Sequence, residues 1–254
     1  YRRCAVAGGN EMISNILLNK GYGKGYVPKS DDSAMIQPLF PTANAAIRKA
    51  ALDEVGFFDT VCKTSGEDLD LCIRMAKTKW ELFFEPSAIV NHKHRTTLFG
   101  LLKQWYGYGN YHPHIFKKHT PRCLEIIYRS RNSMRGWSVL RIYRILGLPF
   151  PFHFLFFVTP FHILNVFLIL SLLAILIKSH WLLMAGLGAW ISCWLYFSGK
   201  AFFQNVILKR NARWIIYSLL RYILNWAYVL GAFFAGLKIG IISLEVTREE
   251  TPSG

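Results

Sequence analysis

A short acidic segment carries the residues best suited to chemistry. Glu67 and Asp68 are adjacent, and Asp70 follows in the run S-G-E-D-L-D-L at 65–71. A positioned carboxylate can act as a general base that removes a proton from a hydroxyl group. The segment also suits a helix start, because Ser65 can cap the helix and Asp68 can complete a capping box. The pattern alone therefore fits both a catalytic and a purely structural role.

The residues after this segment predict the helix that must position it. Leu69, Cys72, Ile73 and Ala76 recur at helical spacing, so we expect an amphipathic helix over 65–79. On such a helix Asp70 and Arg74 lie one turn apart and can form an ion pair. We therefore expect Asp70 to be structural.

The surrounding chain alternates short apolar runs with helical patterns, which favours an α/β sandwich. We expect a helix to start over 42–52, a turn with buried aromatic residues at 55–59, and a second helix over 96–108. Strands are expected at 5–8, ending in a turn at 8–10, at 82–84, ending before Pro86, and at 88–90. The glycine-rich segment 21–25 lacks the spacing of a phosphate-binding motif and is interpreted as a flexible turn.

The C-terminal part of the chain has the composition of membrane helices. No Asp, Glu, Lys or Arg occurs between Arg144 and Lys178. We predict an interfacial or kinked lead-in followed by a span that ends near Ile177, and further spans over about 181–198 and 215–237. The last span could continue to Leu244, and Arg221 is interpreted as an interfacial anchor within it.

The distribution of charge predicts the orientation of these spans. The chain has 30 Lys and Arg against 15 Asp and Glu, a formal charge of +15. Eight basic residues precede the first span with only Glu125 opposing them, and they are Lys117, Lys118, Arg122, Arg129, Arg131, Arg135, Arg141 and Arg144. The positive-inside rule then places the soluble part on the cytoplasmic side of an inner or plasma membrane, against anionic lipid. We expect no nucleic-acid partner, because no motif for one is present.

Three motifs in order connect the acidic segment to a known family. They are T-A-N-A-A-I-R-K at 42–49, L-D-E-V-G-F-F-D at 52–59 and S-G-E-D-L-D-L-C-I-R-M at 65–75. Together they resemble the acceptor-side half of family 2 glycosyltransferases, with N-x-A-x-R, V-G-x-F-D and G-E-D-x-D-L motifs. The resemblance continues through P-S-A-I-V-N-H at 86–92 and Q-W-Y-G-Y-G at 104–109. It covers about residues 4–111 clearly.

The resemblance implies roles for individual residues. Asp68 is the catalytic base that deprotonates the acceptor hydroxyl as it attacks the anomeric carbon, and Glu67 helps to position it. His92 corresponds to a ligand of a divalent metal, Mg²⁺ or Mn²⁺. The residues expected to bind substrate are Asn44, Arg48, Gln104 and Trp105. His92 can instead be a packed strand residue, and Trp105 can pack its helix. The Q-W-Y-G-Y-G segment lacks the Arg and Trp of polymer-forming relatives and is closer to single-sugar transferases.

The predicted organisation follows from both lines of argument. We expect the acceptor-side half of a GT-A type sandwich over 1–115, a basic juxtamembrane segment over 116–147, about three transmembrane helices over 148–244 and a polar tail over 245–254. The family's metal-binding D-x-D lies upstream of the N-x-A-x-R motif. Asp31 and Asp32 do not fit it and are interpreted as a solvated turn.

We therefore expect the donor-binding half, and with it activity and metal binding, to be missing from this chain. The predicted function is inverting sugar transfer from a nucleotide-sugar donor to a lipid-linked or growing glycan acceptor, with membrane lipid as a further partner. The alternative is a non-catalytic membrane scaffold or partner subunit derived from a transferase.

Overall fold

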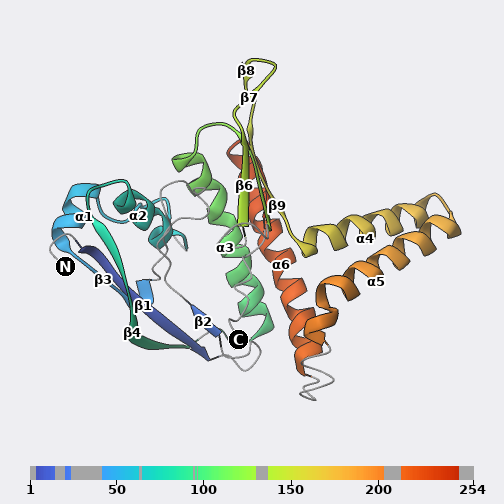
Figure 1. Ribbon diagram of the computed structural model, residues 1–254, viewed down its shortest axis with the longest axis horizontal. Coiled ribbons are helices and arrows are strands. Elements are labelled where there is room, and N and C mark those ends of the chain that lie inside the picture. Colours follow the sequence, from blue (N-terminus) through green and yellow to red (C-terminus); the bar gives the residue numbers. More distant parts are fainter. Residues whose placement is uncertain are drawn as a thin grey trace.

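The computed structural model contains two four-stranded β-sheets and a set of long helices (Figure 1). It describes residues 4–14, 21–23, 42–62, 65–93, 95, 97–129, 137–202 and 213–245. The coarse prediction of a mixed α/β architecture is confirmed. Asp31, Asp32 and the tail after 245 lie outside the described residues.

The N-terminal sheet is built around strand β1 (Cys4–Ser14). β1 pairs antiparallel with β2 (Gly21–Gly23) and β3 (Ala45–Ile47), and parallel with β4 (Glu81–Lys93). Helices α1 (Lys49–Val55) and α2 (Glu67–Ala76) pack together beside this sheet. Their shared core contains Ala51, Leu71, Cys72 and Met75, with Leu82 from β4 packed against it.

Several predicted interruptions of this sheet are wrong. β1 continues through 8–10, β4 continues through Pro86, and part of the glycine-rich segment forms β2. The pairing of β1 with β4 shifts register between the pairs Gly8–Phe84 and Asn10–Ile89. Pro86 falls within this irregularity, where the ladder needs no hydrogen bond from it.

The predicted helix start over 42–52 is also wrong in its first half. Residues Thr42–Asn44 form a single 3-10 turn, η2, and 45–47 form strand β3 before α1 begins at Lys49. Ala45 and Ile47 pair with Gly8 and Val6 of β1. Pairing to a neighbouring strand has overridden the local helical preference of this alanine-rich stretch.

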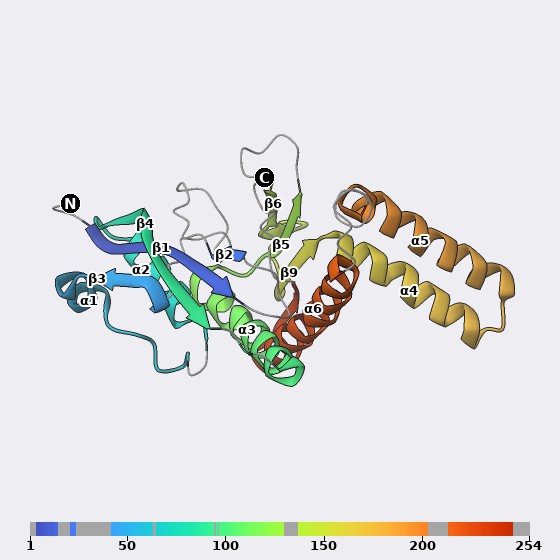
Figure 2. The same cartoon turned by 90° about the horizontal axis from the view of Figure 1, so that it is seen from below.

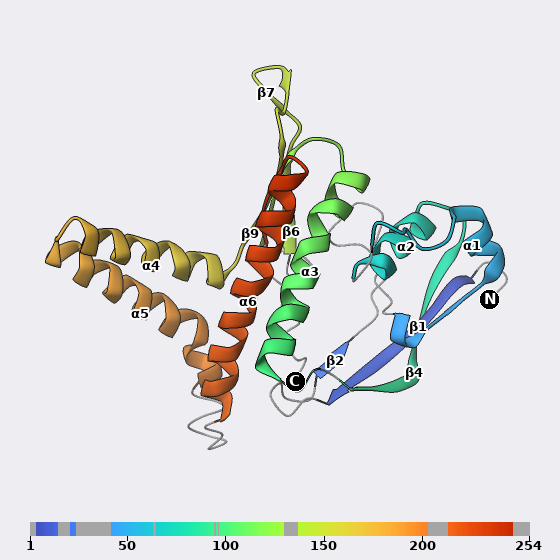
Figure 3. The ribbon, with the colours of Figure 1, turned by 180° about the vertical axis from the view of Figure 1, so that it is seen from behind.

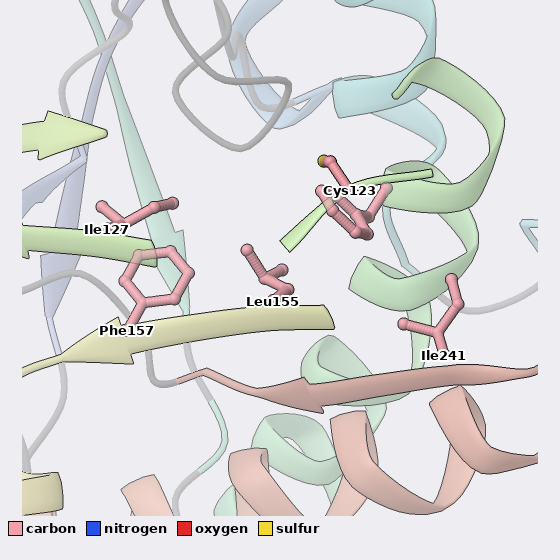
Figure 4. Packing of buried hydrophobic residues seen from close by; sticks show 6 residues of the cluster. Cys123, Ile127, Leu155, Phe157 and Ile241 are labelled. Atoms are coloured by element: carbon pink, nitrogen blue, oxygen red, sulfur yellow. The ribbon is translucent and has the colours of Figure 1, made fainter. Parts of the chain in front are cut away.

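A second sheet occupies the centre of the molecule and has the order β10-β9-β5-β6. Its strands are β5 (Leu124–Arg129), β6 (Trp137–Ile142), β9 (His153–Val158) and β10 (Ile241–Leu244). Between β6 and β9, β7 (Arg144–Ile145) and β8 (Leu148–Pro149) form a small hairpin. The core of this sheet, shown in Figure 4, contains Phe116, Cys123, Ile127, Leu155, Phe157 and Ile241.

This sheet alters the interpretation of two predicted regions. Much of the basic segment 116–147 is folded into it, where Arg141 donates to the buried carboxylate of Glu125 at 2.7 Å. The expected lead-in to the first span contains β9, which pairs in parallel with both β5 and β10. The sequence 153–158 alternates buried and half-buried residues along this strand.

The three predicted spans correspond to three helices. They are α4 (Pro160–Leu176), α5 (His180–Phe202) and α6 (Arg213–Lys238). In the described part of the chain, only Leu219–Lys238 is long and apolar enough to cross a membrane by length and composition. The apolar stretches 160–176 and 180–195 are shorter. Three membrane crossings therefore stay a prediction.

Helix α3 (Leu98–His119) is eleven residues longer than the predicted helix 96–108 at its C-terminal end and continues through Pro113. It runs parallel to α6, which lies between α3 and the α4–α5 hairpin (Figures 1 and 2). The two backbones approach closely at two glycines. A Cβ on Gly109 would lie 2.0 Å from the carbonyl oxygen of Tyr228, and one on Gly231 would lie 2.2 Å from that of Tyr106.

We predict that Gly109→Ala destabilises the chain by about 1–3 kcal/mol or more, because the new methyl group collides with rigid helix backbone. Thermal unfolding followed by circular dichroism measures the effect. Gly107→Ala is the matched control, since a Cβ there meets nothing within 4 Å. Alanine favours helix over glycine, so the control should be neutral or slightly stabilising. Equal effects of both substitutions would contradict the close α3–α6 contact.

Candidate active site

Asp68 lies in the first turn of α2. Its side chain is partly exposed, and its Oδ1 accepts a hydrogen bond from the backbone N–H of Leu69 at 2.8 Å. Glu67, the first residue of the helix, is also partly exposed. The positive end of a helix favours negative charge in its first turn. A carboxyl group that solvent or substrate can reach is therefore available at this position.

The start of α2 is held by helix α3 and not by a capping box. The helix cap is Gly66, in the left-handed conformation with φ 82°, and it has no side-chain cap. Ser65, predicted as the cap, instead donates its hydroxyl to the carbonyl of Gly107 at 3.0 Å. A Cβ on Gly66 would lie 3.0 Å from Ile115 and 3.2 Å from Tyr111. Both backbone conformation and space therefore require glycine immediately before the acidic pair.

The neighbouring carboxylate of Asp70 has a different environment. Asp70 is fully buried, and the predicted ion pair with Arg74 is confirmed at 2.8 Å. Two residues at the end of α3 also reach it, since the Lys118 ammonium and His119 Nε2 each lie 2.8 Å from Oδ1. Asp70 is thus the point at which α2 and the C-terminal turn of α3 are joined.

The same network holds the V-G-F-F-D turn. Arg74 donates to the carbonyls of Val55, Gly56 and Phe57 at 2.7, 2.9 and 2.8 Å. Lys118 also donates to Asp59 at 2.7 Å. The prediction that the aromatic residues of this turn are buried is wrong. Phe57 is 59% exposed and Phe58 42%, because the turn directs its backbone carbonyls toward the protein.

The pKa values of the two aspartates reflect these contacts. Burial would raise the pKa of Asp70, but hydrogen bonds from His119, Lys118 and Arg74 outweigh it and hold the pKa well below its usual value. Hydrogen bonds from Lys118 and the N–H of Val61 also lower the pKa of Asp59. Both carboxylates are therefore held in the ionised form that the network requires.

Asn44 and Arg48 lie in the segment that joins the sheet to α1. The Asn44 side-chain amide donates to the carbonyl of Ala88 at 3.0 Å and so ties η2 to β4. The Arg48 guanidinium lies 5.9 Å from the ring centre of Trp80, within cation–π range. These contacts give both residues a structural role, and their predicted part in substrate binding stays a prediction.

Gln104 and Trp105 lie on α3, close to the contact with α6. The Gln104 amide donates to Tyr108 at 2.8 Å, while its Oε1 is buried without a hydrogen bond from the described residues. Trp105 is only 8% exposed and packs with Leu220 and Leu224 of α6. Its burial favours the packing interpretation. Substrate binding by these two residues stays a prediction.

His92 belongs to strand β4, where its backbone is paired with Ile13 of β1. Its side chain lies outside the described part of the chain, so its predicted role as a metal ligand stays a prediction. Within the described residues, no group of three or more His, Cys, Asp or Glu residues comes together as a metal site.

Comparison with known proteins identifies the class to which this fold and site belong. Residues 30–244 match the family described as "Glycosyl transferase family group 2", and the chain belongs to that family. This confirms the resemblance found in the three ordered motifs. The α/β part that carries Asp68 and the apolar helices both fall within the match.

Two curated relatives are similar to part of the chain. Each is a "Pre-mycofactocin glycosyltransferase" of Mycobacterium tuberculosis, one from strain CDC 1551 / Oshkosh and one from strain ATCC 25618 / H37Rv. Each is 32% identical over 107 residues, which is 42% of this chain and 22% of the relative. The aligned stretch thus spans about a fifth of each relative's length. No solved structure shows significant similarity to the chain.

Three contributors to the site were missed by sequence reasoning. Lys118 and His119 are separated from Asp70 by almost fifty residues, and Lys118 was assigned to a basic membrane-facing stretch. Ser65 bonds to Gly107 on another helix. One signal in the sequence could have indicated that these residues end a helix. Basic side chains commonly occur in the last turn of a helix, and Lys117, Lys118 and His119 follow one another here.

We predict that Asp70→Asn destabilises the chain by about 3–5 kcal/mol, because removal of one buried charge leaves its cationic partners uncompensated. Chemical denaturation at pH 7 measures this loss. The matched control is Asp53→Asn, which removes the exposed i,i+4 pair with Lys49 and should change stability by less than about 1 kcal/mol.

Comparison of Asp70→Asn with the unsubstituted chain also gives a pH test. The lowered pKa of Asp70 means that the unfolded chain binds a proton before the folded chain does. Its stabilising contribution is therefore complete above about pH 4–5 and is lost as the pH falls through the folded pKa. Unfolding of the unsubstituted chain should thus become easier in acid, with a weaker dependence for Asp70→Asn. Identical acid profiles would contradict the network.

Proposed function

We propose that this chain provides the acceptor-activating site of an inverting glycosyltransferase, with Asp68 as the general base. The acceptor hydroxyl loses its proton to Asp68 as its oxygen attacks the anomeric carbon of a nucleotide-sugar. The bond from that carbon to the nucleotide diphosphate breaks in the same displacement, and the configuration is inverted. Family membership supports sugar transfer in general, and the environment of Asp68 supports this particular role.

The observation that carries the proposal is the contrast between two aspartates on one helix. Asp70 is buried and bound by the side chains of Arg74, Lys118 and His119, so it is unavailable to a substrate. Asp68 is partly exposed at the helix start. The backbone just before it is fixed by the hydrogen bond of Ser65 to Gly107 and by the close packing of Gly66 against α3. A general base needs both access to the proton and a fixed position.

The membrane is the second part of the proposal. The α4–α5 hairpin exposes many large apolar side chains, including those of Ile169, Leu172, Leu176, Leu187 and Ile191. We propose that this hairpin anchors the chain in the membrane, with the catalytic part on the cytoplasmic side. An acceptor held at that surface, lipid-linked or a growing glycan, suits the arrangement. The curated relatives are named as pre-mycofactocin glycosyltransferases.

A divalent metal belongs to the proposal only as a partner of the donor. Bound Mg²⁺ or Mn²⁺ would supply positive charge to the leaving diphosphate. In this chain His92 is the residue proposed to contact it. The roles of Asp68, Ser65 and Gly66 do not depend on that contact.

We predict that Asp68→Asn, made in the protein expressed from its complete reading frame, lowers turnover about 10²–10⁴-fold with little change in folding. The amide keeps the shape of the carboxylate but cannot accept the proton. Transfer of radiolabelled sugar from nucleotide-sugars to the lipid and glycan fractions of membranes measures the rate. Asp53→Asn is the control and should retain activity. Turnover of Asp68→Asn equal to the unsubstituted enzyme would rule out the base and favour a non-catalytic scaffold.

A further inference from the structure

His119, the last residue of α3, contacts α2 through both nitrogens of its ring. Its Nε2 lies 2.8 Å from Oδ1 of Asp70, and its Nδ1 lies 3.2 Å from the ammonium group of Lys77. In Figure 3, α2 lies between α1 and α3, and the His119 side chain between α2 and α3 is only 5% exposed. Turning the ring over would put carbon atoms at both contacts. The two contacts therefore fix the orientation of the ring.

The chemistry of these two partners determines which ring nitrogen carries a proton. A lysine ammonium can only donate hydrogen bonds, and an ionised carboxylate such as that of Asp70 can only accept them. Nδ1 of His119 must therefore accept from Lys77, while Nε2–H donates to Asp70. This arrangement requires the neutral imidazole with its proton on Nε2. A protonated ring would direct a second N–H group at the ammonium of Lys77.

The balance of charge around His119 leads to the same protonation state. Among the described residues, the carboxylates of Asp59 and Asp70 are paired with the side chains of Arg74 and Lys118. Two negative charges thus meet two positive charges. A protonated His119 would add a positive charge that no further carboxylate balances, at a site that is almost fully buried. A neutral ring supplies one donor and one acceptor without adding charge.

The contacts of His119 lie further along α2 than the contact that holds its start. The hydroxyl of Ser65 is bonded to Gly107 just before the acidic pair. His119 reaches Asp70 and Lys77, which are seven residues apart and therefore lie on the same side of the helix. α2 is thus tied to α3 at both ends. Without the second tie, the first would become a pivot about which the turn that carries Asp68 could change direction.

We propose that His119 is a positioning residue of the acceptor site. Its neutral ring, protonated on Nε2, passes a hydrogen bond from Lys77 to Asp70 and so holds the direction of α2 and of Asp68. His119 itself contacts no reacting atom in the proposed reaction. The positioning role rests on the proposed function, whereas the protonation state of the ring does not.

Three substitutions of His119 separate a neutral role from a cationic one. His119→Gln keeps a neutral group with both a donor and an acceptor, His119→Lys offers only donors and a charge, and His119→Leu offers neither. We expect the midpoint of thermal unfolding of the full chain to stay near that of the unsubstituted chain for His119→Gln, and to fall for the other two. His180→Gln, at an exposed histidine, is the matched control and should leave the midpoint unchanged.

Nuclear magnetic resonance of the full chain with ¹⁵N-labelled histidine reads the protonation state directly at pH 7. The signals of His119 are those that are absent from His119→Gln. We expect one ring nitrogen with a bonded proton and one without, and the signal of the nitrogen without a proton should shift in Lys77→Met. A ring with protons on both nitrogens, or on Nδ1 alone, would overturn the assignment.

Turnover tests the positioning role in the protein expressed from its complete reading frame. We expect His119→Leu to lower turnover about 10–100-fold with the KM for the nucleotide-sugar unchanged, because the base is misdirected while the donor site is intact. His119→Gln should restore most of this loss. If His119→Leu does not fold, the comparison of His119→Gln with His119→Lys decides.

Two outcomes would reject the positioning role. Better retention of turnover and stability in His119→Lys than in His119→Gln would mean that a positive charge is needed. Equal turnover in all the folded variants would mean that His119 does not direct the base. Full turnover of Asp68→Asn would instead reject the proposed base and leave the unfolding and resonance results standing.

Discussion

The backbone contact between α3 and α6 is the constraint on which the arrangement of the molecule depends. Gly109 and Gly231 each face a carbonyl oxygen of the other helix at a distance that no side chain could occupy. Such an approach leaves little freedom for either helix to slide or turn, since close-packed elements do not deform continuously. α3 is therefore fixed to the apolar C-terminal region on one side. On its other side, Gly107 and Tyr111 hold the start of α2.

The site then shows how environment separates two carboxylates of identical chemistry. Asp68 and Asp70 differ by two positions on α2, which places them about 200° apart around the helix. Asp70 faces the protein, where Arg74 and Lys118 compensate its charge and His119 also contacts its carboxylate. Asp68 remains accessible. The buried aspartate joins three segments whose relative position determines where the exposed one can meet a substrate.

The sequence predicted what local patterns and ordered motifs can specify. The helix beginning at Glu67, the Asp70–Arg74 pair and the positions of the apolar helices all follow from spacing within one segment. Pairing across the chain could not be predicted in this way. Ala45–Ile47 became a strand because β1 was available to it, and Pro86 was tolerated because β4 shifts register there. Ser65 does not cap α2, because its hydroxyl donates to the carbonyl of Gly107, which lies 42 residues away in the sequence.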